Sequence, residues 1–328
     1  MAISSWQSEL KQVIRETRTL MEYVGLDDND EAISSAATES FPVRVPHAFL
    51  NRIRHEDRDD PLLRQVLPAS AEDEETAGFN EDPLGESRHQ PVPGLLAKYP
   101  GRVLLVATGV CAIHCRYCFR RYFPYQESNA ARENWQPALT AIREDADIHE
   151  VILSGGDPLS LADEKLFGLL QSLAAIPHIR RIRIHSRMPV VVPNRITRTL
   201  VATLSSIRPR VIMVIHANHA NEIDAEVAAA MTRLHAAGLP LLNQSVLLRG
   251  VNDDPAALAQ LSERLFDCHV LPYYLHMLDP VAGAAHFLVD DERARAIMVD
   301  LRSRLPGYLV PKLVREEEGE LSKTPLGE

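Results

Sequence analysis

The sequence is poor in several features that mark particular classes of protein. It has four cysteines in 328 residues, too few for a disulfide scaffold in a chain of this length. No apolar run approaches the ~20 residues that span a bilayer. The N-terminus has no apolar stretch behind basic residues, as a secretory signal would have. We therefore expect a cytoplasmic protein that does not enter a membrane.

Positive charge is also in short supply. Lysine and arginine number 35 against 45 aspartates and glutamates, which gives a net charge of −10. A chain this acidic is poorly suited to grip phosphate backbones by charge alone, so we expect no nucleic-acid partner. Apolar residues make up 45% of the sequence and charged residues 24%, which is typical of a folded globular protein and excludes a wholly disordered one.

Short apolar runs alternate with helical patterns from about residue 101 onward. Strands are predicted at 102–110, 150–156, 179–186, 210–217, 240–248 and 269–277, and helices at 133–145, 163–175, 196–206, 222–237, 254–267 and 290–304. Six strand-then-helix units imply parallel strands joined by right-handed crossovers. The α/β fold is then a curved partial barrel or an open doubly wound sheet, with its site at the carboxyl ends of the strands.

The chain divides into three predicted parts. Residues 1–95 form a mainly helical extension, residues 96–285 contain the strand–helix units, and residues 286–328 form a helix and a short tail. Apolar residues at roughly helical spacing predict one amphipathic helix over 4–24. Residues 68–94 are rich in Asp, Glu, Gly and Pro, which predicts a surface connection.

Three of the four cysteines lie within eight residues, directly after the first predicted strand. Cys111, Cys115 and Cys118 are spaced so that one loop can wrap three thiolates around a compact centre. Sulfur ligands select zinc, copper(I) or an iron–sulfur cluster. Three ligands to a four-iron cluster leave one iron open for another ligand. The alternative is a structural zinc site that adds His114 or a distant histidine.

The segment CAIHCRYC resembles the C-x3-C-x2-C signature of radical S-adenosylmethionine (SAM) enzymes. The resemblance implies a partial (β/α)6 radical SAM barrel and a [4Fe–4S] cluster held by Cys111, Cys115 and Cys118. It also implies that the open iron chelates SAM, whose reductive cleavage yields a 5′-deoxyadenosyl radical. SGGDP, after the second predicted strand, looks like the glycine-rich segment of that family, with Gly155 and Gly156 exposing backbone toward SAM.

A closer resemblance is to the lysine 2,3-aminomutases. It covers roughly residues 40–328 through five motifs in order, which are YPGRVLLVATGVCAIHCRYCFRRYF, SRMPVVVPNRIT, HANHANEI, NQSVLLRGVND and SKTP. That family also carries pyridoxal phosphate (PLP) on a lysine before Thr-Pro, which is Lys323 here. Radical formation at an unactivated carbon and a π-system for the migrating nitrogen explain why both cofactors are needed.

The resemblance implies a role for each matching residue. SAM contacts are expected from Ser154, Gly155, Gly156, Asp157, His216 and Gln244. PLP contacts are expected from Lys98, Tyr99, Arg102 and Lys323, the last of which binds the cofactor covalently. Substrate contacts are expected from Arg120, whose planar fork suits the α-carboxylate, and from Asp279 and Glu316, which face the distal ammonium.

Two departures from the family pattern bear on the substrate site and the tail. Glu316 stands where the family has a second ammonium-binding aspartate, and Lys98 stands where it has an arginine. The sequence continues for only five residues after Lys323, whereas longer aminomutases place zinc-binding cysteines there. Cys268 is accordingly expected to be a free buried thiol.

The short form implies production of (R)-β-lysine from free L-lysine for modification of elongation factor P. The implied partners are an external electron donor of the flavodoxin or ferredoxin type and a separate ligase that acts on the factor. A homo-oligomer is compatible with the sequence. One alternative is a stand-alone lysine or glutamate aminomutase of other amino-acid metabolism, although Asp279 would repel an anionic side chain. Another is a non-catalytic zinc or iron–sulfur protein.

Overall fold

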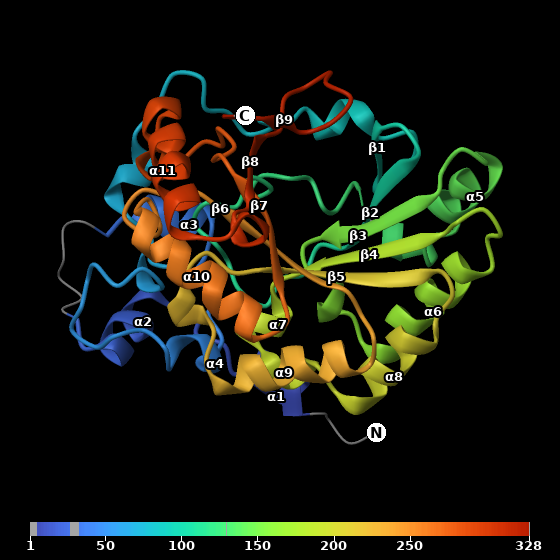
Figure 1. Cartoon of the computed structure of the whole chain (residues 1–328), viewed down its shortest axis with the longest axis horizontal. Helices are drawn as coiled ribbons and strands as arrows, with labels where there is room; N and C mark the ends of the chain where they lie inside the picture. Colours follow the sequence, from blue (N-terminus) through green and yellow to red (C-terminus); the bar gives the residue numbers. More distant parts are fainter. Residues whose placement is uncertain (1–4, 27–32, 129, 328) are drawn as a thin grey trace.

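The computed structural model of the chain describes residues 5–26, 33–128 and 130–327. Its centre is one nine-stranded sheet whose strands follow each other in sequence order (Figure 1). The strands are β1 (Leu95–Tyr99), β2 (Arg102–Thr108), β3 (Glu150–Gly155), β4 (Arg181–Ser186), β5 (Arg210–His216), β6 (Leu241–Val246), β7 (Leu271–His276), β8 (Lys312–Arg315) and β9 (Thr324–Pro325).

Strands β2 to β8 are parallel, whereas β1 and β9 pair antiparallel at the two edges. All six predicted parallel strands, β2 to β7, are therefore confirmed. The sequence did not reveal β8 and β9, which add the C-terminal tail to the same sheet. The tail thereby lies at the carboxyl end of the parallel strands, where sites in such folds are found.

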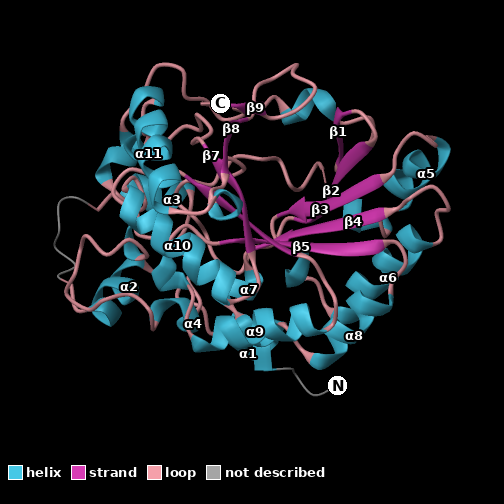
Figure 2. Ribbon diagram, viewed as in Figure 1, coloured by secondary structure: helices cyan, strands magenta, loops and turns pink. Residues whose placement is uncertain are grey.

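A helix follows each of the six predicted strands, as expected from the periodicity. These helices are α5 (Gln136–Glu144), α6 (Asp163–Ala174), α8 (Arg198–Ser206), α9 (Ala225–Ala236), α10 (Pro255–Asp267) and α11 (Asp291–Arg304), with a short α7 (Met188–Val191) after β4. Figure 2 shows them on the outer side of the curved sheet. The fold is the predicted partial barrel. Among the described residues, no helix has the length and apolarity needed to cross a bilayer.

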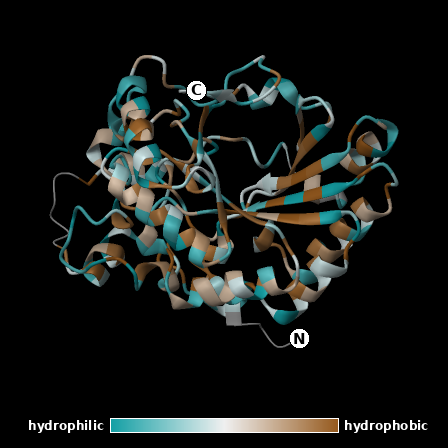
Figure 3. Ribbon diagram, viewed as in Figure 1, coloured by the Kyte–Doolittle hydropathy of each residue, from teal (hydrophilic) through white to brown (hydrophobic). Residues whose placement is uncertain are grey.

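The strands divide their side chains between the two faces of the sheet. One buried apolar row runs across five strands toward the helices, through Leu105, Leu153, Ile184, Met213 and Leu241. Alternate residues face inward, because side chains along a strand point to opposite faces. In Figure 3 the strands are largely hydrophobic, and the outer helices mix both colours.

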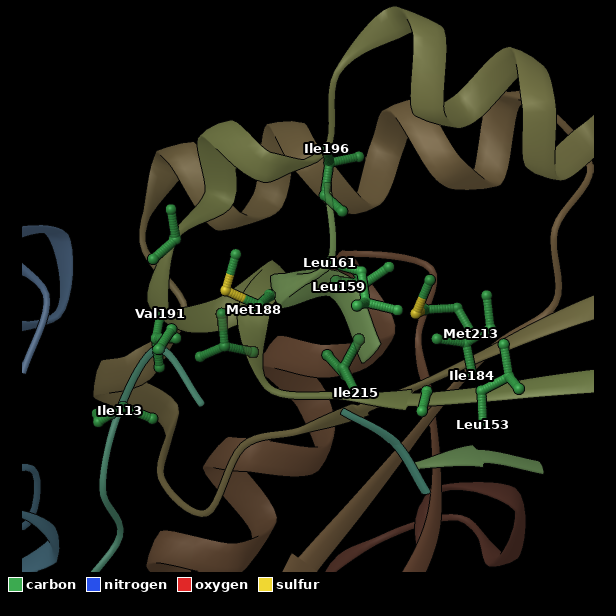
Figure 4. Close-up of a cluster of buried hydrophobic side chains, with 14 of the residues drawn as sticks. Ile113, Leu153, Leu159, Leu161, Ile184, Met188, Val191, Ile196, Met213 and Ile215 are labelled. Carbon is green, nitrogen blue, oxygen red and sulfur yellow. The ribbon is translucent and has the colours of Figure 1, made fainter. Parts of the chain in front are cut away.

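The core also fixes the loop that carries the three cysteines. Ile113 lies between the first two cysteines, and its side chain is only 4% exposed. It belongs to the same apolar cluster as residues of β3, β4, β5 and α7 (Figure 4). Burial of an isoleucine side chain contributes about 1.5–3 kcal/mol, so the loop is held to the barrel by packing.

The prediction of one helix over 4–24 is wrong; residue 4 lies outside the described residues. The chain forms two helices, α1 (Ser5–Lys11) and α2 (Thr17–Val24), and a non-helical segment joins them. Ile14 and Val45 exchange two backbone hydrogen bonds of 2.9 and 3.0 Å. This pairing takes the backbone groups that a continuous helix would use. The extension also contains α3 (Ser35–Ser40) and α4 (His47–Leu50).

Residues 68–94 are more than the predicted surface connection. The segment contains two glutamates, Glu72 and Glu86, whose side chains are buried. Glu72 binds Arg116 and Arg121, and Glu86 binds Arg120, all three on the cysteine loop. Buried carboxylates require such partners. The acidic character of this segment therefore serves an interior contact that composition alone does not reveal.

Candidate active site

A cavity of about 600 Å³ opens at the carboxyl ends of the parallel strands. Every residue assigned to a site from the sequence lines it. The set comprises Lys98, Tyr99, Arg102, Cys111, Cys115, Cys118, Arg120, Ser154, Gly155, Gly156, Asp157, His216, Gln244, Asp279, Glu316 and Lys323. The structure thus brings all of these residues together, although they come from distant parts of the sequence.

The three cysteines face this cavity from one loop after β2. The loop is pinned by its backbone: the N–H of His114 donates to the carbonyl of Arg44 at 2.9 Å, and that of Cys118 to the carbonyl of Cys115 at 2.9 Å. Within the described ranges, no three His, Cys, Asp or Glu side chains converge as they would around one metal ion. The three thiols line one cavity without converging on a single ion, which suits a larger centre with several irons.

The electrostatics of the thiols also favour a positively charged centre. Burial and the neighbouring cysteines raise the pKa of Cys118 to about 11 and the pKa of Cys111 well above its usual value. Asp157 adds to the shift at Cys111. Three adjacent thiolates repel one another in a low-dielectric site, and bound iron would compensate that charge. The residues present therefore fit a cluster.

Gly155, the last residue of β3, and Gly156 after it permit close contact between β3 and the chain that leads into the cysteine loop. Gly155 has φ +113°, and a Cβ there would come within 2.6 Å of the carbonyl oxygen of Thr108. A Cβ on Gly156 would come equally close to the carbonyl oxygen of Val110. The N–H of Gly156 donates to Thr108 at 2.7 Å. Glycine is thus required by packing here, whether or not the backbone also contacts SAM.

Asp157 organises the loop after β4. Its carboxylate accepts hydrogen bonds from the hydroxyl of Ser186 at 2.7 Å and from the backbone N–H groups of Arg187 and Met188 at 2.7 and 3.1 Å. Burial raises its pKa, and these donors oppose the shift. The contacts make Asp157 a positioning residue for the β4 exit, and its predicted contact with SAM stays a prediction.

His216 and Gln244, predicted to contact SAM, lie side by side, His216 at the end of β5 and Gln244 within β6. The amide nitrogen of Gln244 donates to Nε2 of His216 at 2.9 Å. Burial and the positive charges of Arg187 and Arg120 lower the pKa of His216 to about 3. The imidazole is therefore neutral, with its proton on Nδ1. The pair leaves the Nδ1–H of His216 and the second amide N–H and the amide oxygen of Gln244 for a polar ligand in the cavity.

Arg120 is held by a glutamate that the sequence did not indicate. Its Nε and Nη2 each donate to a carboxylate oxygen of Glu86 at 2.7 Å, and Nη1 donates to the hydroxyl of Ser154 at 3.0 Å. Five N–H bonds are available on a guanidinium, so two remain for another carboxylate. Glu86 and Ser154 therefore orient the guanidinium of Arg120 without using all of its N–H donors.

Glu316 lies between two lysines. Its carboxylate oxygens are 2.6 Å from Nζ of Lys323 and 3.1 Å from Nζ of Lys98. These cations, Lys323 first, lower the pKa of Glu316 to about 2 although burial opposes them. Lys98 is also 3.8 Å from Glu86. Lys98, predicted to contact PLP, is thus paired with two carboxylates.

Arg102 differs from Lys98 in having no carboxylate within bonding distance among the described residues. Its guanidinium lies over the Tyr99 ring at 4.8 Å and lines the cavity. Lys323 approaches the face of Tyr274, with Nζ 6.0 Å from the ring centre. A cation without an acidic partner, an aromatic face and a lysine amine in one cavity fit a phosphorylated aromatic aldehyde such as PLP.

Asp279 lies in the same cavity, and no described residue donates a hydrogen bond to its carboxylate. Burial raises its pKa to about 7; Glu316 and Glu86 add to the shift, whereas Lys323 and Lys98 oppose it. A carboxyl group with a raised pKa is stabilised most in its ionised form when a cation approaches, because the cation favours that charged form. The site is therefore prepared for a positively charged ligand group.

Arg187, His185 and His276 are among the cavity residues that had no assigned role in the sequence analysis. Burial lowers the pKa of both histidines well below the usual value, so both are neutral. Each occupies an inward position near the carboxyl end of its strand, and alternation along the strand was the signal that could have found it.

Comparison with known proteins agrees with this geometry. Residues 105–261 match the family model of the Radical SAM superfamily. The L-lysine 2,3-aminomutase of Escherichia coli K12 is 49% identical over 98% of this chain and 94% of its own, and that of Haemophilus influenzae is 47% identical over 98% and 95%. The enzyme of that name from Clostridium subterminale is 37% identical over 98% of this chain and 78% of its own.

Among solved structures, Streptococcus suis SuiB bound to its precursor peptide SuiA is similar with a TM-score of 0.50 at 13% identity. The match covers 66% of this chain and 48% of SuiB, and it shows the fold alone. The barrel and its three-cysteine loop define a radical SAM enzyme, which implies a [4Fe–4S] cluster and SAM. Within that class the chain belongs to the L-lysine 2,3-aminomutase family, and it is an isomerase.

Proposed function

We propose that the enzyme converts L-lysine to β-lysine with a [4Fe–4S] cluster, SAM and PLP. The observation that carries the proposal is the placement of Lys323, Glu316 and Asp279 in the same cavity as the three cysteines. The names of the E. coli and H. influenzae relatives support lysine as the substrate. The cluster and SAM supply a radical that abstracts hydrogen, and PLP supplies the π-system for amino-group migration.

The protein's own residues bind and orient these groups. Cys111, Cys115 and Cys118 hold the cluster, and the neutral His216–Gln244 pair contacts SAM. Lys323 binds PLP covalently, and Arg102 contacts its phosphate as an uncompensated cation.

The enzyme binds the substrate at both its α-carboxylate and its distal ammonium. Arg120, oriented by Glu86, takes the α-carboxylate with its two remaining N–H bonds. Asp279 receives the distal ammonium. Glu316 provides a second negative charge nearby, shared with Lys98 and Lys323. A glutamate substrate is disfavoured, because its side-chain carboxylate would meet two acidic groups.

We further propose that the product is (R)-β-lysine and that it is used to modify elongation factor P. The resemblance to the short form of the family supports this role. A ligase would attach the product, and a flavodoxin or ferredoxin type of protein would reduce the cluster. The alternative is a lysine 2,3-aminomutase that serves other amino-acid metabolism.

The decisive test is chiral analysis of the product formed from L-lysine. The enzyme is reconstituted anaerobically with iron, sulfide and PLP, then supplied with SAM and a reductant. (R)-β-Lysine is expected. The S isomer would contradict the elongation factor role, and the absence of any β-lysine while SAM is cleaved would contradict the substrate assignment.

A further inference from the structure

Arg187 makes a direct contact with one of the three cysteines. It follows β4, and its side chain is 6% exposed. Nη1 of its guanidinium donates to Sγ of Cys115 at 2.6 Å. No such contact from a charged donor to Cys111 or Cys118 occurs among the described residues, so Arg187 singles out one of the three sulfurs.

The guanidinium is fixed by a buried polar network drawn from several elements. Nη2 donates to Oε1 of Gln65 at 2.6 Å and to Oε2 of Glu222 at 3.0 Å. Gln65 comes from the N-terminal extension and Glu222 from the loop after β5. Asn218 donates to the same Gln65 oxygen at 3.0 Å, and the hydroxyl of Tyr117 lies 3.3 Å from it.

Two nitrogens of the Arg187 guanidinium lie outside this network: Nη1, which donates to the sulfur, and Nε, which has no hydrogen-bond partner among the described residues. Phe49 and Tyr117 place ring centres 5.4 and 5.8 Å from the guanidinium carbon. Gln65 and Glu222 occupy its Nη2 end. Arg195, another buried arginine, pairs with Asp163 at 2.7 Å and also donates to the backbone carbonyls of Leu159 and Leu161 at 2.7 and 3.2 Å. Arg187 pairs with Glu222 in the same way, but one of its further acceptors is the sulfur of Cys115, in the cavity that all three cysteines line.

We propose that Arg187 is a positioning residue for the cluster, whose hydrogen bond to the Cys115 sulfur raises the cluster's reduction potential. This rests on the proposed role of the three cysteines. Hydrogen bonds to ligand sulfurs and nearby positive charge stabilise the reduced cluster, which carries one more electron. That electron comes from an external one-electron donor protein. Arg187 thereby makes reduction of the cluster by that donor more favourable.

The test is a redox titration of the reconstituted enzyme, followed by the EPR signal of the reduced cluster without SAM or lysine. In Arg187→Gln the charge is removed, so we expect a midpoint potential more negative than that of the wild type, at unchanged iron and sulfide content. Arg187→Lys keeps the charge and should recover part of the shift. Arg195→Gln removes an equally buried arginine away from the sulfurs and should leave the potential unchanged.

A loaded Arg187→Gln cluster with the wild-type potential would overturn the proposal. If Arg187→Gln does not assemble a cluster, Arg187→Lys is the deciding variant. Lysine keeps the charge but lacks the guanidinium that donates to the sulfur, so a midpoint potential equal to that of the wild type would again overturn the proposal. The cysteine assignment fails separately, if Cys115→Ala still binds a full cluster. A shift in Arg195→Gln equal to that in Arg187→Gln would show a general effect of core disruption and would also reject the specific role.

Discussion

At the scale of single residues, Asp279 is the most informative group in the cavity. It is a carboxylate without a described hydrogen-bond donor, placed near Glu316 and Glu86, and its pKa is raised to about 7. A half-buried acid without a partner is unfavourable for folding in its ionised form. The presence of Asp279 in the cavity despite this cost is consistent with the proposed contact to a substrate ammonium.

The substitution Asp279→Asn should separate charge recognition from support of the fold. We expect kcat/KM for lysine to fall at least about a hundredfold, since loss of one partner of a buried ion pair costs about 3–5 kcal/mol and each ~1.4 kcal/mol is tenfold. An uncharged lysine analogue should lose much less, because it leaves no ammonium unpaired. Equal losses for both substrates would contradict the assignment.

The raised pKa of Asp279 also predicts the direction of a pH effect. Below about pH 7 the carboxyl of the free enzyme is protonated and cannot attract the ammonium, so kcat/KM for lysine should rise with pH through this range. Asp279→Asn should remove that rise. A profile of the same shape in the variant would assign the titration to another group.

The stability of the cofactor-free protein should respond with the opposite sign. The pKa of Asp279 lies above its usual value of 3.8, so the folded state holds the proton more tightly than the unfolded state. Its contribution to stability is complete below about pH 4 and is lost as pH rises through 7. Asp279→Asn should therefore melt at a higher temperature than the wild type at pH 8, with a smaller difference at pH 5.

At the scale of elements, the acidic segment over 68–94 supports the cysteine loop from outside the barrel. Glu86 orients Arg120, and Glu72 binds both Arg116 and Arg121. The loop that carries the cysteines is thus fixed on one side by the apolar core and on the other by two buried carboxylates. The geometry of the proposed substrate contact depends on a segment that does not belong to the barrel.

Glu86→Gln tests this dependence. A neutral amide cannot accept both N–H bonds of Arg120, so we expect at least a tenfold lower kcat/KM for lysine and for the uncharged analogue alike, since both carry the α-carboxylate. Stability should fall by about 1–3 kcal/mol. The exposed Glu81 of the same segment offers a matched control, and Glu81→Gln should change neither quantity. Selective loss for lysine alone would place Glu86 at the ammonium end instead.

The sequence predicted the barrel elements well and the N-terminal extension less well. Each predicted strand from β2 to β7 and each helix after it exists, because their apolar periodicity agrees with their tertiary environment. The break between α1 and α2 was not predictable, because the partner of Ile14 is Val45, a non-local contact. Glu86 was missed for the same kind of reason: its burial depends on Arg120, and acidic composition normally indicates a surface.

At the scale of the whole molecule, the sheet brings the two proposed cofactor sites together. The cysteine loop follows β2, and Lys323 immediately precedes β9, at the opposite end of the strand order. Both line one cavity, because the parallel strands all end on the same side of the curved sheet (Figure 1). The two proposed sites nevertheless use separate segments of the chain, so each should be removable without the other.

Crossed substitutions test this independence. Lys323→Ala should lose PLP that borohydride can fix to the chain, while its iron and sulfide content stays at the wild-type level. The triple variant Cys111→Ala, Cys115→Ala and Cys118→Ala should show the reverse, with covalent PLP retained and both the cluster and SAM cleavage lost.

Two controls match these variants. Lys312→Ala removes another lysine that lines the cavity and should keep covalent PLP, and Cys268→Ala removes a buried free thiol and should keep the cluster. Peptide mapping after borohydride treatment locates the PLP, and iron analysis quantifies the cluster. PLP fixed to a different lysine in Lys323→Ala would refute the C-terminal assignment. Retained iron and SAM cleavage in the triple variant would refute the cluster ligands, since no other cysteine lines the cavity among the described residues.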